Sequence, residues 1–357
     1  MKYDFLIIGG GIAGISIGGR LAPNGSVCVL ETEDSIGYHA SGRSAAMFLE
    51  NYGNDIVVEL NKASTPYHKK GGYLTDRGLM SLGRSQDKDS FLAEINAMNL
   101  EQISISEALD LFPIINTKSV EYVSFLKQAP DLDTDKILQD FAKMVRRNNG
   151  VIKTKTNVKN IKKLAKSWRV ETNKESFEGT ILINAAGAWV DEVALMANVQ
   201  PLDFIPMRRS IARVPSPTAA STGNWPMVHG VGDRWYAKPD AGAWLISPCE
   251  EDPMHPHDAF ADDMVLAEGI DRYSKMVNHE ITSLQTSWAG LRTFSQDHAL
   301  VIGFDKSTKD FFWFAGQGGY GFQTAPAASQ LASELILSNA TSLAKATVEA
   351  LSPKRFD

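Results

Sequence analysis

The sequence contains few of the features that mark disulfide-rich, metal-binding or membrane proteins. Only two of its 357 residues are cysteine, Cys28 and Cys249, and no CxxC spacing occurs. This excludes a disulfide framework, a thiolate metal site and a dithiol redox pair, and it favours a reducing compartment, the cytoplasm. The apolar stretch from Phe5 to Gly19 is too short and too rich in glycine to span a bilayer. We therefore expect no integral membrane segment.

An excess of positive charge is also missing. The net charge is −6, and no basic patch, internal repeat or low-complexity tract is present. Nucleic acid and anionic membranes are therefore not expected partners. Hydrophobic residues make up 43% and charged residues 22% of the chain, as in ordinary globular proteins. The length favours two domains or one elaborated α/β unit.

A dinucleotide fingerprint lies near the start of the sequence. Residues 3–8 (YDFLII) predict a buried strand, and Gly9, Gly11 and Gly14 then form GxGxxG at the start of a predicted helix. The first glycine permits the tight turn, the second lets the backbone approach a pyrophosphate, and the third lets the helix pack closely on the sheet. The pattern predicts a βαβ unit that binds phosphates at the helix N-terminus.

Two further features support this interpretation. A second predicted strand, residues 26–30, is followed by Glu31, which stands 22 residues after Gly9, where an acidic residue binds the ribose 2′-hydroxyl. Residues 311–315 predict a strand that leads into the glycine-rich turn 316–321 and a helix to about residue 338. The N–H groups of such a turn can stabilise the negative charge of a reduced flavin. The pair of turns favours FAD over a nicotinamide.

Five further segments occur in order along the chain: YHASGRSAA (38–46), PMRRS (206–210), WYAKPDAG (235–242), SWAGLRTF (287–294) and GQGGYGFQT (316–324). In these segments the chain resembles the D-amino acid oxidase-like FAD-dependent oxidoreductases, and within that group it is most similar to bacterial D-arginine dehydrogenases. The resemblance implies an α/β fold, in which a discontinuous Rossmann-type FAD-binding domain (1–50, 135–205 and 295–357) carries a mixed-sheet substrate domain (51–134 and 206–294). It also implies non-covalent FAD.

The resemblance implies which residues bind FAD. They come from the first turn, the loop after the second strand, the middle of the chain and the final glycine turn. They are Gly9, Gly11, Ile12, Ala13, Gly14, Glu31, Thr32, Ala40, Ser41, Gly42, Arg43, Ser44, Ala45, Ala46, Met47, Val158, Ala186, Gly187, Gly318, Gly319, Tyr320, Gly321, Phe322 and Gln323.

The resemblance also implies a substrate site. The implied reaction transfers a hydride from Cα to flavin N5 and gives an imino acid, which water hydrolyses to a keto acid and ammonia. Arg209 and Arg292 match positions that bind the carboxylate, and Tyr236 matches a tyrosine that assists them. Tyr52 matches a lid residue, and Gly319 and Gln323 match positions beside the amine and the flavin.

Two positions depart from the D-arginine dehydrogenase pattern. Met47 stands where a histidine is expected, and Leu79 stands where a glutamate would pair with a guanidinium. These changes favour a D-amino acid with a neutral or apolar side chain. Glu50, close to the lid residue Tyr52, would replace the missing glutamate only if its side chain turned inward.

Several alternatives stay open at this level. The same carboxylate clamp would serve a secondary amine such as an N-alkyl amino acid, of the kind that sarcosine or glycine oxidases use. A flavin-carrying subunit of a hetero-oligomer is a second alternative. The sequence does not define the electron acceptor, which can be oxygen, a quinone or another carrier, nor does it define the oligomeric state.

No metal site is expected. Asp131, Asp133 and Asp135 imitate a calcium loop but lack its glycine and its final glutamate, so a helix start is the better interpretation. His255 and His257 have no third ligand nearby and fit a proline-rich loop.

Overall fold

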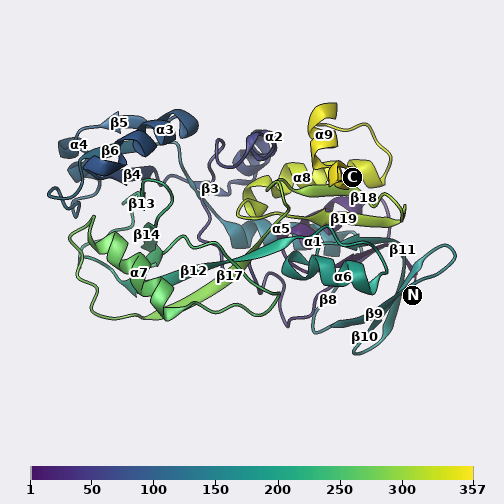
Figure 1. Ribbon diagram of the computed structural model, residues 1–357. Helices are drawn as coiled ribbons and strands as arrows, with labels where there is room; N and C mark the ends of the chain where they lie inside the picture. Colours follow the sequence, from purple (N-terminus) through teal and green to yellow (C-terminus); the bar gives the residue numbers. More distant parts are fainter. Residues whose placement is uncertain (1, 357) are drawn as a thin grey trace.

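The computed structural model describes residues 2–356 and contains two large sheets with helices packed around them. The first sheet lies on the right of Figure 1 and the second on the left, and the long strands β12 and β17 reach from the second sheet toward the first. The predicted α/β class, with a mixed second sheet, is confirmed.

The first sheet has a parallel centre. Its main path has the order β18-β19-β11-β1-β2-β8, in which β18 is antiparallel to β19, while β10 and β9 extend from β11 as an antiparallel meander. The predicted strands 3–8 and 311–315 are confirmed. The strands are β1 (Lys2–Ile8), β2 (Val27–Leu30), β8 (Val151–Lys153), β9 (Val158–Lys163), β10 (Trp168–Thr172), β11 (Ser176–Asn184), β18 (Val301–Phe304) and β19 (Phe311–Ala315).

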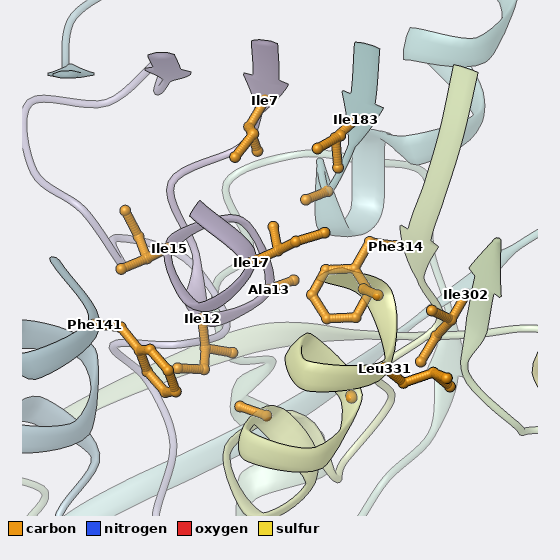
Figure 2. Close-up of a cluster of buried hydrophobic side chains, with 14 of the residues drawn as sticks. Ile7, Ile12, Ala13, Ile15, Ile17, Phe141, Ile183, Ile302, Phe314 and Leu331 are labelled. Carbon is orange, nitrogen blue, oxygen red and sulfur yellow. The ribbon is translucent and has the colours of Figure 1, made fainter. Parts of the chain in front are cut away.

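Helices α1 (Ile12–Leu21), α5 (Thr134–Arg147) and α8 (Gly321–Ile336) share an apolar core with this sheet. Figure 2 shows Ile7 and Ile183 of the sheet above α1. Ile17 of α1 and Phe314 of β19 lie below these two side chains, in the same cluster. Burial of such side chains contributes about 1.5–3 kcal/mol each. This core fixes the N-terminal ends of α1 and α8 at the carboxyl edge of the strands.

Helix α2 (Asp55–Gly71) packs on α8 within the same core. The buried ring of His68 donates from Nε2 to the carbonyl oxygen of Gln323 at 2.9 Å, so α2 supports the first turn of α8. Helices α6 (Val190–Met196) and α9 (Lys345–Leu351) complete this part of the chain.

The second sheet has the order β16-β12-β15-β14-β13-β4-β6-β5. Off this path, β17 pairs antiparallel with β12. Helices α3 (Lys88–Met98), α4 (Ile105–Leu111) and α7 (Asp263–Ser274) accompany it, and Trp244, Phe112 and Tyr273 fill the core on one of its faces. The strands are β4 (Leu79–Gly83), β5 (Glu101–Ile103), β6 (Tyr122–Leu126), β12 (Ile205–Pro215), β13 (Met227–Gly230), β14 (Tyr236–Asp240), β15 (Ala243–Ser247), β16 (Asp252–Pro253) and β17 (Thr286–Phe294).

The predicted domain boundaries stay a prediction. Strands of the first sheet come from residues 2–30, 151–184 and 301–315, and those of the second from 79–126 and 205–294. A two-stranded sheet joins β3 (Leu74–Thr75) to β7 (Asp131–Leu132). None of the helices within residues 2–356 has the length and apolar character needed to cross a membrane.

Candidate active site

A cavity of about 540 Å³ is lined by residues of both sheets. It brings together the residues that the sequence predicted for FAD and substrate, except for three. Gly14 and Gly42 pack against backbone carbonyls, and Tyr320 stands at the N-cap of α8 with its ring against Tyr52. The remaining predicted residues line the cavity, which is therefore the candidate active site.

The first glycine turn forms one end of the cavity. Gly9 adopts φ 107°, and a Cβ atom there would overlap the carbonyl oxygen of Ala185. The N–H of Gly10 donates to Glu31 Oε2 at 2.6 Å, and the N–H of Glu33 donates to Glu31 Oε1 at 2.9 Å. These bonds fix the buried carboxylate of Glu31 at the end of β2. Each of its oxygens keeps a second lone pair for a ribose hydroxyl.

The loop after β2 crosses from one sheet to the other. Ser41 Oγ accepts a hydrogen bond from the N–H of Ile12 at 3.0 Å, so it caps α1 and keeps its own hydroxyl hydrogen to donate. The Arg43 guanidinium donates to the carbonyl oxygens of Ala259 and Ala289, both at 2.8 Å, and pairs with Asp258 at 2.5 Å. Arg43 thus ties the loop to β17.

The cavity has the features that FAD requires. Gly187 has no other group within 4 Å of an added Cβ, and at Gly11 only Ser41 Oγ would come close, so both backbones face open space. Thr293 and Gln323 line the cavity, and within residues 2–356 the buried atoms Thr293 Oγ1 and Gln323 Nε2 have no hydrogen-bond partner. Unpaired buried polar atoms are costly, and a bound polar ligand would satisfy them. The first turn of α8 also faces the cavity.

The substrate end lies against the second sheet. Arg292 on β17 and Arg209 on β12 both line the cavity, and Arg209 is paired with Glu251 at 2.7 Å. The Arg292 guanidinium makes no hydrogen bond or ion pair within the described part of the chain. Its Nη1 lies 3.0 Å from the position that a Cβ of Gly319 would occupy. Arg292 is therefore a cation without a partner among residues 2–356, and it lies beside the C-terminal glycine turn.

Two cavity tyrosines are held protonated. Burial raises the pKa of Tyr236 and of Tyr52, so their hydroxyls can donate to a carboxylate. The ring of Tyr52 packs edge-on against Tyr320 at 5.5 Å, and burial raises the pKa of Tyr320 to about 12. Together, Tyr52 and Tyr320 place an aromatic pair beside the substrate end.

The segment that carries Tyr52 is held by one buried side chain. Asn61 on α2 donates from Nδ2 to the carbonyl oxygens of Leu49, Glu50 and Tyr52 at 3.3, 3.2 and 2.9 Å. The Glu50 carboxylate turns the other way and accepts a hydrogen bond from Thr65 Oγ1 at 2.6 Å. It therefore does not replace the glutamate that is absent at Leu79.

The rejected metal patterns have structural roles. Asp133 caps α5 by accepting from the N–H of Lys136 at 3.0 Å, which confirms the helix start. Asp131 is paired with Arg77 at 2.8 Å and with Lys238. Over residues 2–356, no three His, Cys, Asp or Glu side chains gather in a way that could hold a metal ion.

Sequence reasoning missed part of the cavity wall. Met227, His229, Asp233 and Cys249 also line it. Burial raises the pKa of Cys249 to about 11, so it is a thiol at neutral pH. The alternation of Met227 and His229 along β13 could have indicated that both side chains lie on one face of this strand. The structure shows that this face meets the cavity, because His229 pairs with the cavity residue Tyr236 on β14.

Comparison with known proteins defines the family. The family described as DAO, FAD dependent oxidoreductase, matches residues 4–335, and the chain belongs to it. The protein is therefore an FAD-dependent oxidoreductase. The comparisons leave its likeness to D-arginine dehydrogenases in particular as a prediction.

Individual relatives are distant but cover most of the chain. Glycine oxidase from Bacillus licheniformis is 23% identical over 95% of this chain and 94% of its own length. Glycerol 3-phosphate dehydrogenase from Caloramator mitchellensis is 22% identical over 92% of this chain and 72% of its own. The crystal structure of L-proline dehydrogenase from P. horikoshii has a TM-score of 0.84 at 23% identity and covers 99% and 98% of the two chains.

Proposed function

We propose that this protein oxidises a small amino acid at Cα, with the substrate carboxylate bound by Arg292. The observation that carries the proposal is the Arg292 guanidinium, which has no partner among residues 2–356 and lines a cavity that also fits FAD. A half-buried cation in a cavity attracts an anion, and a carboxylate is the ligand that a planar guanidinium binds in a fixed orientation. The names of two relatives, a glycine oxidase and an L-proline dehydrogenase, support an amino acid as substrate.

The protein's own residues then bind and orient the substrate. Arg292 and Arg209 hold the carboxylate, and the protonated hydroxyl of Tyr236 donates a hydrogen bond to it. Tyr52 and Tyr320 exclude water from the reacting carbon. Bound FAD supplies the acceptor for the hydride that leaves Cα. The resulting imino acid is hydrolysed by water to a keto acid and ammonia, so positioning and dehydration account for most of the catalysis.

The cavity wall favours a neutral or apolar substrate side chain. Leu79, Met47 and Met227 line it, while the Glu50 carboxylate faces Thr65. A cation without a buried carboxylate partner would cost several kcal/mol, whereas each buried methylene contributes about 0.8 kcal/mol. The D configuration is carried over from the family resemblance.

The test is to measure kcat/KM for D-methionine, D-leucine, D-arginine and D-lysine, with the matching L-enantiomers and N-methyl amino acids alongside. We expect the neutral D-amino acids to be the better substrates. A preference of about tenfold or more for D-arginine and D-lysine would contradict the inference that the cavity wall favours a neutral or apolar side chain.

Two alternatives are decided by the same panel. Oxidation of N-methyl amino acids in preference to primary amines would indicate a secondary-amine substrate, which the Arg292 clamp would also hold. If the isolated chain bound FAD but reduced no artificial dye with any amine, a flavin-carrying subunit of a larger complex would be the better interpretation.

A further inference from the structure

A polar group lines the substrate end on the strand next to Tyr236. His229 on β13 is the direct cross-strand partner of Tyr236 on β14, and both side chains line the cavity. Paired residues on one face of a sheet have Cβ atoms about 5 Å apart. A substrate whose carboxylate is held beside Tyr236 would therefore direct a side chain of a few atoms toward His229. Met227 and Leu79, which pair across β13 and β4, flank this position.

Within residues 2–356, the imidazole of His229 lacks a hydrogen-bond partner. The residue is only 5% exposed, and among the described residues neither ring nitrogen makes a hydrogen bond. Nε2 lies 3.4 Å from Glu94 Oε1, and Nδ1 lies 4.0 Å from Asp233 Oδ1. Glu94 does not line the cavity and is itself held by Ser81 Oγ at 2.5 Å and by the N–H of Gly232 at 3.2 Å.

This arrangement leaves the imidazole, at the wall of the cavity, with one nitrogen that can accept a hydrogen bond. Glu94 Oε1, 3.4 Å from Nε2, can only accept, so a hydrogen on Nε2 is the one that faces it and Nδ1 is the nitrogen that can accept. The carboxylate of Asp233, which also lines the cavity, is a second acceptor. Of the two, His229 is buried, whereas the side chain of Asp233 is 70% exposed and its charge is screened by solvent.

We propose that His229 determines substrate specificity by accepting a hydrogen bond from a neutral donor at the end of the substrate side chain, such as a carboxamide. The inference rests on the proposed function and narrows it. A neutral donor satisfies the buried acceptor, and it avoids placing a cation between Leu79 and Met227. An apolar side chain of the same length leaves the imidazole unpaired. The wall thus selects D-glutamine over D-methionine.

The experiment compares these two substrates, which have similar length, by anaerobic flavin reduction and by kcat/KM. We expect wild type to prefer D-glutamine by about tenfold. His229→Leu should abolish this preference, because kcat/KM for D-glutamine should fall about tenfold more than kcat/KM for D-methionine. His229→Asn, which keeps an acceptor near the position of Nδ1, should restore part of the preference. His255→Leu is the matched control, since His255 is exposed and lies outside the cavity lining.

The outcomes separate this inference from the proposed function. Equal use of both substrates by wild type, or a preference that survives in His229→Leu, would overturn the role of His229 and leave the Arg292 site standing. If kcat/KM for D-arginine or D-lysine were about tenfold higher than for D-glutamine, the cavity wall would bind a cationic side chain and the proposed role of His229 would be wrong. If no amino acid reduced the flavin in wild type, both proposals would fall. An equal loss with both substrates in His229→Leu would show a structural role only.

Discussion

Replacement of Arg292 is the most informative change to the candidate site. Its guanidinium has no partner in the described chain and lies against Gly319 at the C-terminal glycine turn. In Arg292→Met the carboxylate would lose its charged, bidentate partner. A hydrogen bond to a charged group contributes about 1.5–3 kcal/mol, and about 1.4 kcal/mol corresponds to a factor of ten. We therefore expect kcat/KM for amino acids to fall by about a hundredfold, with FAD content unchanged.

The assay combines steady-state kcat/KM with the rate of anaerobic flavin reduction. Arg292→Lys should recover only part of the activity, because an ammonium does not form the planar bidentate pair. Arg213→Met is a matched control. Arg213 lies on β12 in the same sheet, pairs with Asp240 at 3.1 Å and does not line the cavity. Flavin reduction at wild-type rates in Arg292→Met would show that the carboxylate binds elsewhere.

Three further predictions concern the cofactor turn, the lid and stability. In Gly10→Ala the new Cβ would stand 2.7 Å from Glu31 Oε2, so we expect the purified protein to carry less FAD, as measured by the ratio of flavin to protein absorbance. Asn61→Ala removes the hydrogen bonds that hold Tyr52 and should lower kcat/KM several-fold with FAD retained. Burial lowers the pKa of His68 below its usual 6.5, and the unfolded chain therefore binds a proton more readily than the folded one. Stability should fall as the pH drops below about 6.5, and His68→Gln should reduce this slope in urea unfolding at about pH 7.5 and 5.5.

Each of these has a control or a contradicting result. Gly223→Ala, at an exposed glycine with only Ser221 Oγ nearby, should keep its FAD. Asn148→Ala removes an exposed side-chain bond to Met144 and should leave kinetics unchanged. Full FAD content in Gly10→Ala, wild-type kinetics in Asn61→Ala, or an unchanged pH slope in His68→Gln would refute the respective argument. Burial also lowers the pKa of His279, so part of the slope should remain.

The local features of the FAD site could be predicted from the sequence. Gly9 and Glu31 lie on consecutive elements of one βαβ unit, and the spacing alone brings them together. Strand 311–315 was predicted because its apolar run ends in a glycine turn, and the structure has the same bounds. Helix α8 ends at Ile336, two residues before the predicted end, where boundaries are least defined by pattern.

The substrate wall could not be predicted in the same way. His229 meets Tyr236 because β13 and β14 pair in one register, and a shift of one residue would turn it to the other face. Arg43 is one of the residues that the resemblance implies for FAD, and only the structure shows that its guanidinium bonds carbonyl oxygens more than 200 residues away in the sequence. Asn61 carries no motif, and its role depends on how α2 packs. Such long-range contacts are set by the tertiary structure alone.

The central claim is that this protein holds FAD and an amino acid in one cavity, with the carboxylate on Arg292. The most direct measurement is anaerobic titration of the purified yellow protein with a panel of amino acids and N-methyl amino acids, followed at the flavin absorbance band. The account predicts that FAD is released intact on denaturation and that neutral D-amino acids bleach the flavin in wild type, about a hundredfold less efficiently in Arg292→Met. Protein that cannot be loaded with FAD, or a flavin that no amino acid reduces, would contradict it.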